Sequence, residues 1–363
     1  MQDVVLFTEE EEKKVLYGKF KNLYIPLINK KIISKSLELD NDNSLRNRIN
    51  KKFIITSTKF INTKIMFKEV KKLALNTYIN ECFKKINGYK YSVIYTGMEN
   101  ISEYYTIELI DENGMELGYA KIPQKTQCNK SIFREIEVLK YLETLNLQSA
   151  NIPKVLYYDE CHNIFIQSTK SNLKKDKGNI DIKHINFLSE LYEKTNEICE
   201  FKESRFYNHL INIKNKTSNE YLIELSNKIL NKISIDKIQG CYCHGDFYIS
   251  NIKWYNDNLF VYDWDGADTR AVYYDLFHYI ASEDIINKKI KKITIINNIL
   301  KDNKYIELYE TKNNINKDIR VSMFIYYLYE IIYEFAVEMK LDITKDIILI
   351  NYIEIMNIVL DNM

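Results

Sequence analysis

The order of strand-like and helix-like segments limits the folds open to this chain more than any other feature. Residues 91–122 contain three extended segments, YSVIYTG, EYYTIELI and MELGYAKI, and the turn-forming sequence DENG separates the last two. A helical pattern follows at 131–145, and two further strand candidates, KVLYYDE and NIFIQS, lie beyond it. After residue 169 helical periodicity dominates, apart from a short extended pair at 251–262. Strands followed by helices predict an α+β fold.

The length of 363 residues exceeds the size at which one hydrophobic core usually stops growing, so we expect two lobes. The pattern predicts an antiparallel-sheet lobe over residues 89–168 and a mostly helical lobe with one small hairpin over residues 169–363. An extension of unknown role over residues 1–88 precedes them. Within it, apolar residues at nearly helical spacing predict a helix from about Ile65 to Ile86.

The overall charge and the cysteine spacing exclude several classes of protein. The chain has 51 basic and 50 acidic residues, so it carries no global field that would attract nucleic acid. No apolar run approaches the roughly 18 residues of a membrane span, and the N-terminus lacks a signal-peptide pattern. The six cysteines show no regular spacing. We therefore expect a cytoplasmic protein with reduced thiols and a small-molecule partner.

The strongest motif is CHGDFYISN at residues 243–251, which is followed by VYDWD at residues 261–265. It places His244-Gly245-Asp246 five residues before Asn251, and an apolar strand then ends at Asp263. Kinase chemistry needs one carboxylate to orient and deprotonate the attacking hydroxyl. It also needs an amide oxygen and a second carboxylate to hold magnesium on the nucleotide phosphates. The motif supplies all three groups in one segment.

At these residues the sequence resembles the aminoglycoside phosphotransferase and choline kinase-like family, which has a bilobal protein-kinase-like fold. The resemblance implies that Asp246 is the catalytic base, that Asn251 and Asp263 bind Mg²⁺, and that His244 organises the loop. The family also has an Asp-Leu pair downstream, which Tyr274-Asp275-Leu276 matches, and it implies a structural role for Asp275. The alternative is an ordinary surface loop, but several features of the family occur here in the correct order.

The sheet lobe offers a second check on this interpretation. A kinase-like site needs a lysine on its third strand that pairs with a helix glutamate and steadies the phosphates. Lys121 lies in GYAKI and Glu135 in the following helix, and the family pattern favours Glu135 over Glu137. Each of these residues could instead be a solvated charge.

The expected nucleotide loop joins the first two strands, and it contains a single glycine. Gly97 and Ser102 are candidates for covering the phosphates, with an ordinary hairpin turn as the alternative. The segment ending at Ser168 falls where a hinge would present backbone groups to the purine of ATP or GTP. Neither a protein-kinase glycine-rich loop nor a Walker motif is present.

The remaining charged motifs have less specific interpretations. Glu330, Glu334 and Glu338 recur at every fourth residue, a spacing that places three carboxylates on one helix face. Either the face is solvated or it holds an amine of the acceptor. Cys241-x-Cys243-His244 lacks the two further ligands that zinc would need. We expect the other histidines, at positions 162, 184, 209 and 278, to be structural or exposed.

These inferences together predict an enzyme. It would move the γ-phosphoryl group of ATP or GTP, with Mg²⁺, to a hydroxyl of a sugar, amino sugar, amino alcohol or aminoglycoside. One alternative is a catalytically silent kinase-fold protein that binds nucleotide or a partner. A protein kinase is less favoured, because the His-Arg-Asp, Asp-Phe-Gly and Ala-Pro-Glu motifs are missing.

Overall fold

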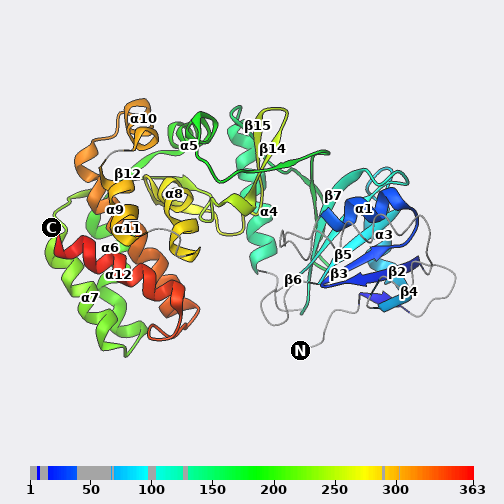
Figure 1. Ribbon diagram of the computed structural model, residues 1–363, viewed down its shortest axis with the longest axis horizontal. Coiled ribbons are helices and arrows are strands. Elements are labelled where there is room, and N and C mark those ends of the chain that lie inside the picture. Colours follow the sequence, from blue (N-terminus) through cyan, green and yellow to red (C-terminus); the bar gives the residue numbers. More distant parts are fainter. Residues whose placement is uncertain are drawn as a thin grey trace. The chain divides into compact units, whose positions relative to one another are not determined.

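The chain folds into two units in the computed structural model (Figure 1). Unit 1 comprises Met1–Thr144 and Ile152–Leu173, and unit 2 comprises Leu145–Asn151 and Lys174–Met363. The structure describes residues 6–8, 15–38, 67, 69–96, 104–125, 130–287, 291–301 and 303–363. In the described residues no helix has the length and apolar character needed to cross a membrane.

Unit 1 is built around a sheet in which nine described strands follow the order β1-β4-β2-β3-β5-β6-β7-β10-β9. Every neighbouring pair is antiparallel. The strands are β1 (Phe7–Thr8), β2 (Val15–Phe20), β3 (Leu23–Pro26), β4 (Glu69–Leu75), β5 (Tyr91–Tyr95), β6 (Tyr104–Ile110), β7 (Glu116–Pro123), β9 (Val155–Asp159) and β10 (Ile164–Ser168). Four of them, β1 to β4, come from the first 88 residues, and β3 pairs directly with β5.

Helices α1 (Lys30–Glu38) and α3 (Thr77–Phe83) pack on opposite faces of this sheet. Val93 contacts the cluster that contains α1, and its neighbour Ile94 contacts the cluster that contains α3. Successive residues of a strand point to opposite faces, so both faces of β5 are covered.

The helix predicted over residues 65–86 is wrong in its first half. Residues 69–75 form strand β4, and only Thr77–Phe83 are helical. Val70 and Leu73 have helical spacing, but β4 is held on both sides by β1 and β2. Strand pairing therefore overrides a periodicity that is ambiguous in short apolar segments.

The meander predicted from residue 91 onwards is confirmed. Strands β5, β6 and β7 pair in sequence, and helix α4 (Lys130–Leu145) and strands β9 and β10 follow as expected. Gly114 has a φ of +73°, and its N–H donates to the carbonyl oxygen of Asp111 at 3.2 Å. Glycine suits this turn because it adopts positive φ without steric cost.

Unit 2 is mostly helical, as predicted. Its described α-helices are α5 (Ile182–Thr195), α6 (Arg205–Lys216), α7 (Glu220–Lys232), α8 (Tyr274–Asn287), α9 (Lys292–Leu300), α10 (Lys304–Asn313), α11 (Arg320–Tyr333) and α12 (Ile347–Asp361). Every residue from Ser322 to Tyr333 is buried, so α11 is the central helix of this unit.

Two small sheets accompany these helices, whereas the sequence predicted a single hairpin. The predicted hairpin is present as β14 (Ile252–Tyr255) and β15 (Asn258–Val261), and it is flanked by β11 (Lys174–Lys175) and β8 (Ala150–Asn151). The second sheet has the order β12-β13-β16, formed by Glu197–Glu200, Lys237–Cys243 and Asp268–Ala271. Strand β12 follows α5 directly and interrupts the helical pattern that dominates after residue 169.

Candidate active site

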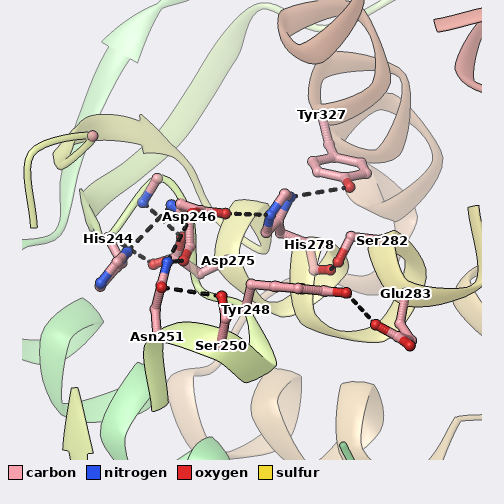
Figure 2. Close-up of polar contacts among 12 residues, drawn as sticks. His244, Asp246, Tyr248, Ser250, Asn251, Asp275, His278, Ser282, Glu283 and Tyr327 are labelled. Carbon is pink, nitrogen blue, oxygen red and sulfur yellow. Dashed lines mark hydrogen bonds and ion pairs between the residues drawn. The ribbon is translucent and has the colours of Figure 1, made fainter. Parts of the chain in front are cut away.

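The His244–Asn251 loop begins where β13 ends, and the first turn of α8 contacts it through Asp275 (Figure 2). The carboxylate of Asp275 accepts hydrogen bonds from the N–H of His244 at 2.7 Å and from the N–H of Gly245 at 3.0 Å. Burial raises the pKa of Asp275, although His244 and the two N–H groups act in the opposite direction. The structural role expected of Asp275 is therefore visible as two hydrogen bonds to the loop backbone.

Glycine is the only residue type that fits at position 245 in the loop. Its φ is +85°, and a Cβ atom placed on it would lie 2.2 Å from the carbonyl oxygen of Gly266. That separation is far below any tolerable contact, and the positive φ disfavours other residues independently. The loop consequently passes very close to the backbone that follows Asp263.

The imidazole of His244 ties the loop to the end of β15. Its Nδ1 accepts the N–H of Asp246 at 3.2 Å, and its Nε2 lies 3.0 Å from the carbonyl oxygen of Tyr262. Because Nδ1 accepts, we assign the proton to Nε2, which donates to Tyr262. Both ring nitrogens are used within the loop, as a loop organiser requires, and neither points to the thiols of Cys241 and Cys243.

The carboxylate of Asp246 is 56% exposed, yet side chains hold both of its oxygens. Oδ1 lies 3.0 Å from Nε2 of His278, and Oδ2 accepts the amide N–H of Asn251 at 2.7 Å (Figure 2). Partial burial acts to raise the pKa of Asp246, but the hydrogen bonds from His278 and Asn251 lower it overall. Asp246 is thus an ionised, solvent-facing carboxylate with a fixed orientation.

Asn251 and Asp263 lie at the same end of the β14–β15 hairpin. Ile252 pairs with Val261, and the N–H of Tyr262 donates to the carbonyl oxygen of Asn251 at 3.1 Å. The amide nitrogen of Asn251 is turned to Asp246, which directs its Oδ1 elsewhere, and among the described residues Oδ1 accepts the hydroxyl of Ser250. Asp263 has a φ of +70°, a strained conformation of the kind that is often found at functional sites.

These two residues form a suitable donor set for magnesium. Among the described residues no group of three or more His, Cys, Asp or Glu side chains could hold a metal. Magnesium does not need such a cage, because it is usually bound by one or two protein oxygens together with substrate phosphates and water. An amide oxygen and a carboxylate at the end of one hairpin fit that requirement.

In unit 1, Lys121 and Glu135 form the ion pair expected from the sequence. Nζ of Lys121, on β7, lies 2.6 Å from Oε2 of Glu135 on α4, and the two side chains are 5% and 1% exposed. Glu137 is exposed, so Glu135 is the partner. Nζ also lies 4.8 Å from the centroid of the Tyr104 ring, a cation–π distance.

The structure says less about the other residues that were expected to contact the nucleotide. Gly97 and Ser102 lie outside the described residues. Ser168 ends β10, where its N–H donates to the carbonyl oxygen of Lys154 and its hydroxyl accepts the N–H of Lys154, both at 2.8 Å. Its N–H is therefore already used, which leaves its carbonyl oxygen as the backbone group at this position to contact a base.

The three glutamates expected on one helix face lie in three different environments. Glu330 is 2% exposed, and its oxygens contact Nε of Arg205 at 3.2 Å and Nδ1 of His209 at 2.8 Å. At Glu334 the α-helix changes to a π-helix, Glu334–Glu338, in which Glu334 is partly exposed and Glu338 is exposed. Glu330 is thus neither solvated nor available, so both interpretations of the motif are wrong for this residue.

Glu334 is the one glutamate of the three that stays a candidate for binding an acceptor. Its side chain is partly exposed, and it makes no hydrogen bond or ion pair with any described residue. Burial raises the pKa of Glu334, while the charges of Arg270, Arg205 and His278 lower it in part. These three cations are the charged groups that favour the ionised form of Glu334.

His278 is the residue of this site that sequence reasoning missed. It was expected to be structural or exposed, but its Nε2 contacts Asp246. A usable signal was present, since Asp275 and His278 are three residues apart and share one face of a helix. Once Asp275 is placed beneath the loop, the next turn of the helix must lie beside it as well.

Comparisons with known proteins give a match only at the level of structure. No protein-family model matches the sequence, and no curated protein matches it significantly. The choline kinase LicA from Streptococcus pneumoniae gives a TM-score of 0.51 at 12% identity, covering 79% of this chain and 98% of that chain. The streptomycin–ATP complex of APH(2'')-IIa gives 0.49 at 16% identity, covering 78% and 98%. A putative fructosamine-3-kinase from Haemophilus somnus gives 0.48 at 14% identity, covering 77% and 96%.

The likeness to choline kinase shows the fold. This chain has the bilobal protein-kinase-like fold of small-molecule kinases, with an antiparallel-sheet unit followed by a helical unit. The fold predicted from the sequence is confirmed.

Proposed function

We propose that this chain transfers the γ-phosphoryl group of ATP or GTP to a hydroxyl group of a small molecule. The observation that carries the proposal is the loop around Asp246, in which an ionised, solvent-facing carboxylate is held at both oxygens. A carboxylate fixed in this way can orient an acceptor hydroxyl and take its proton as the oxygen attacks phosphorus. The small-molecule kinase fold supports this interpretation.

We assign the roles of the other residues by the groups that they present. His244 and Asp275 fix the loop backbone, and Asn251 and Asp263 would hold Mg²⁺, which when bound neutralises charge on the phosphates. Lys121, braced by Glu135, would steady the phosphates. Catalysis would come mainly from positioning and electrostatics rather than from covalent chemistry.

The acceptor we propose is a sugar, amino sugar, amino alcohol or aminoglycoside, and Glu334 favours the amine-bearing members of that group. Its carboxylate is partly exposed and makes no ion pair with a described residue, so it could bind an ammonium group. We propose a cytoplasmic location for the protein. The described cysteines, at positions 82, 161, 199, 241 and 243, are free thiols, which are typical of a reducing compartment.

The direct test uses the full-length protein with ATP or GTP, Mg²⁺ and a panel of hydroxyl-bearing acceptors. Nucleoside diphosphate release and the mass of the product would be measured for the wild type and for Asp246→Asn. We expect the variant to lose about 10²- to 10⁴-fold in turnover, the usual contribution of a general base. Its binding of magnesium nucleotide should be nearly unchanged, because Asp246 acts on the acceptor.

Two outcomes would contradict the proposal. Transfer by Asp246→Asn at the wild-type rate would exclude Asp246 as the base. Tight binding of magnesium nucleotide with no consumption on any acceptor would instead support a catalytically silent nucleotide-binding protein.

A further inference from the structure

His278 contacts Asp246, and the proposed mechanism has so far given His278 no role. It lies on α8, one turn beyond Asp275, and is 9% exposed. Its Nε2 is 3.0 Å from Oδ1 of Asp246, on the side of the carboxylate away from Asn251 (Figure 2). Asp246 is therefore held from two directions by two different elements.

The imidazole of His278 is itself held by buried groups. Its Nδ1 lies 3.3 Å from the hydroxyl of Tyr327 on α11, and that hydroxyl lies 3.1 Å from the hydroxyl of Tyr352 on α12. The ring of Tyr274 is parallel to the imidazole, with 6.4 Å between centroids and an interplanar angle of 4°. Ser282, one turn further along α8, donates its hydroxyl to the carbonyl oxygen of His278 at 2.5 Å. The imidazole thus has a fixed position in the wall of the site.

The direction of the hydrogen bond to Asp246 follows from these contacts. A tyrosine hydroxyl can donate to Nδ1 of a neutral imidazole or accept from Nδ1 of an imidazolium. In both states Nε2 carries a hydrogen that points to Asp246. The contact with the carboxylate is consequently the same whether or not His278 is charged.

We infer that His278 is a positioning residue for phosphoryl transfer, held by Tyr327 and acting by fixing the carboxylate plane of Asp246. The inference rests on the proposed function. With Oδ1 on His278 and Oδ2 on Asn251, the carboxylate cannot rotate, and its remaining lone pairs keep one direction for the acceptor hydroxyl. Without His278, an aspartate that is 56% exposed would rotate and exchange its partner for water.

The competing explanation is that His278 only ties α8 to α11. The two explanations differ in what a substitution should change. A tie between helices affects the free energy of unfolding, whereas a positioning residue affects turnover and leaves nucleotide binding intact. A glutamine can still donate from roughly the position of Nε2, and a leucine cannot.

The kinetic test compares His278→Gln, His278→Leu and Tyr327→Phe with the wild type. We expect kcat to fall about 10- to 100-fold in His278→Leu, as a misplaced reacting group would cause, with the nucleotide KM unchanged. His278→Gln should recover most of that loss, and Tyr327→Phe should fall between the two. Tyr329→Phe is the matched control, because it removes a buried hydroxyl of the same helix that bonds to Ser226 at 2.7 Å. It should leave kcat unchanged.

A second measurement does not depend on activity. The chain has only 5 histidines, so ring ¹⁵N spectra of histidine-labelled protein contain few signals. The signals of His278 are identified as those that are absent from the spectrum of His278→Gln. We expect the Nε2 shift of His278 to move in Asp246→Asn and its Nδ1 shift to move in Tyr327→Phe, but neither to move in Tyr329→Phe.

The outcomes separate the inference from the proposed function. Wild-type turnover in His278→Leu would overturn the role of His278. So would ring ¹⁵N shifts of His278 that change neither in Asp246→Asn nor in Tyr327→Phe. A wild-type protein that binds nucleotide without transferring phosphate, but shows the expected ring shifts, would overturn the proposed function and leave the positioning contact established.

Discussion

Asp246 and Asp263 are both assigned to catalysis, but the backbone imposes a stricter condition on Asp263. Its φ of +70° lies in the left-handed region, which asparagine and aspartate tolerate better than most residues. An alanine at this position would add backbone strain to the loss of the carboxylate. Asparagine removes the charge at little conformational cost, so it isolates the role of the carboxylate.

For Asp263→Asn we expect magnesium-dependent nucleotide binding to weaken by about 10-fold or more, because a charged metal ligand is lost. Calorimetric titration of nucleotide with magnesium, and again with a chelator, would measure this change. Binding without magnesium should be the same in the variant and the wild type. If the variant kept the full magnesium dependence of the wild type, Asp263 could not be a ligand.

Much of the candidate site could be predicted at the level of single residues. The loop motif named Asp246, Asn251 and Asp263 as candidates because their spacing is local in the sequence, and the structure places Asn251 in contact with Asp246. His278 was missed since its role depends on a contact between residues 32 positions apart. No local pattern marks such a contact unless the helix beneath the loop has already been identified.

At the scale of elements, the α-helix changes to a π-helix at Glu334–Glu338, and three glutamates of equal spacing differ in exposure: Glu330 is buried, Glu334 is partly exposed and Glu338 is exposed. Sequence periodicity assumes one helix type throughout, so it could not show this change. Similarly, the hairpin turn at Lys21-Asn22 contains no glycine, although Lys21 has a φ of +52°, and strands β2 and β3 went unrecognised. Strands β6 and β7, which a glycine turn separates, were predicted correctly.

Glu334→Gln tests whether this helix end binds the acceptor. A partly desolvated carboxylate–amine contact is worth about 1.5 to 3 kcal/mol. We therefore expect the KM of an amine-bearing acceptor to rise by about 10- to 150-fold, and that of an amine-free analogue to stay the same. Glu338→Gln, which changes an exposed residue on the same segment, is the control. Equal effects on both acceptors, or an effect that salt removes, would place Glu334 outside the site.

The segment after β11 is anchored in unit 2 by Asp176. The side chain is 1% exposed and accepts hydrogen bonds from Nε1 of Trp254 at 2.7 Å and from the hydroxyl of Tyr279 at 2.5 Å. Burial opposes ionisation, but Nε2 of His184 at 3.3 Å and the hydrogen bonds from Tyr279, Gly178 and Trp254 outweigh it and lower the pKa of Asp176 to about 2.

This pKa predicts a dependence of stability on pH. The unfolded chain takes up the proton first, so the ionised Asp176 stabilises the fold fully above about pH 4, and the effect is lost as pH falls towards 2. We expect Asp176→Asn to lower the free energy of unfolding by about 2 kcal/mol at pH 6, a difference that shrinks below pH 4. Both tryptophans, Trp254 and Trp264, lie in unit 2, so their fluorescence during urea titration measures this unit alone. A difference that stayed constant from pH 6 to pH 3 would contradict the assignment.

At the scale of the whole molecule, the first 88 residues are a structural part of unit 1. They supply β1 to β4, and β3 covers the edge of β5 that would otherwise be open. Leu23, Ile25 and Ile33 pack with Val93 and Ile110 in one core cluster. About a fifth of this chain is not covered by the match to choline kinase.

Deleting residues 1–88 should therefore unfold unit 1 rather than release an independent kinase. The deletion would expose an edge strand together with several side chains whose burial contributes about 1.5 to 3 kcal/mol each. We expect loss of β-sheet circular dichroism and of nucleotide binding, while the urea transition monitored by tryptophan fluorescence persists for unit 2. Wild-type nucleotide affinity in the truncated protein would show that the first strands are dispensable.

Helix α8 gathers nearly all of the support for the loop onto one element. Asp275, His278 and Glu283 contact the loop, Ser282 bonds to the carbonyl of His278, and Tyr279 bonds to the buried Asp176. Their intervals of three, one, three and one residues follow one strip of a helix. Natural variation can then change the loop while this strip is kept, but a single inserted residue would turn half of the strip by about 100°. We accordingly expect the spacing D-x-x-H-Y-x-x-S-E in relatives of this chain that hold the loop in the same way.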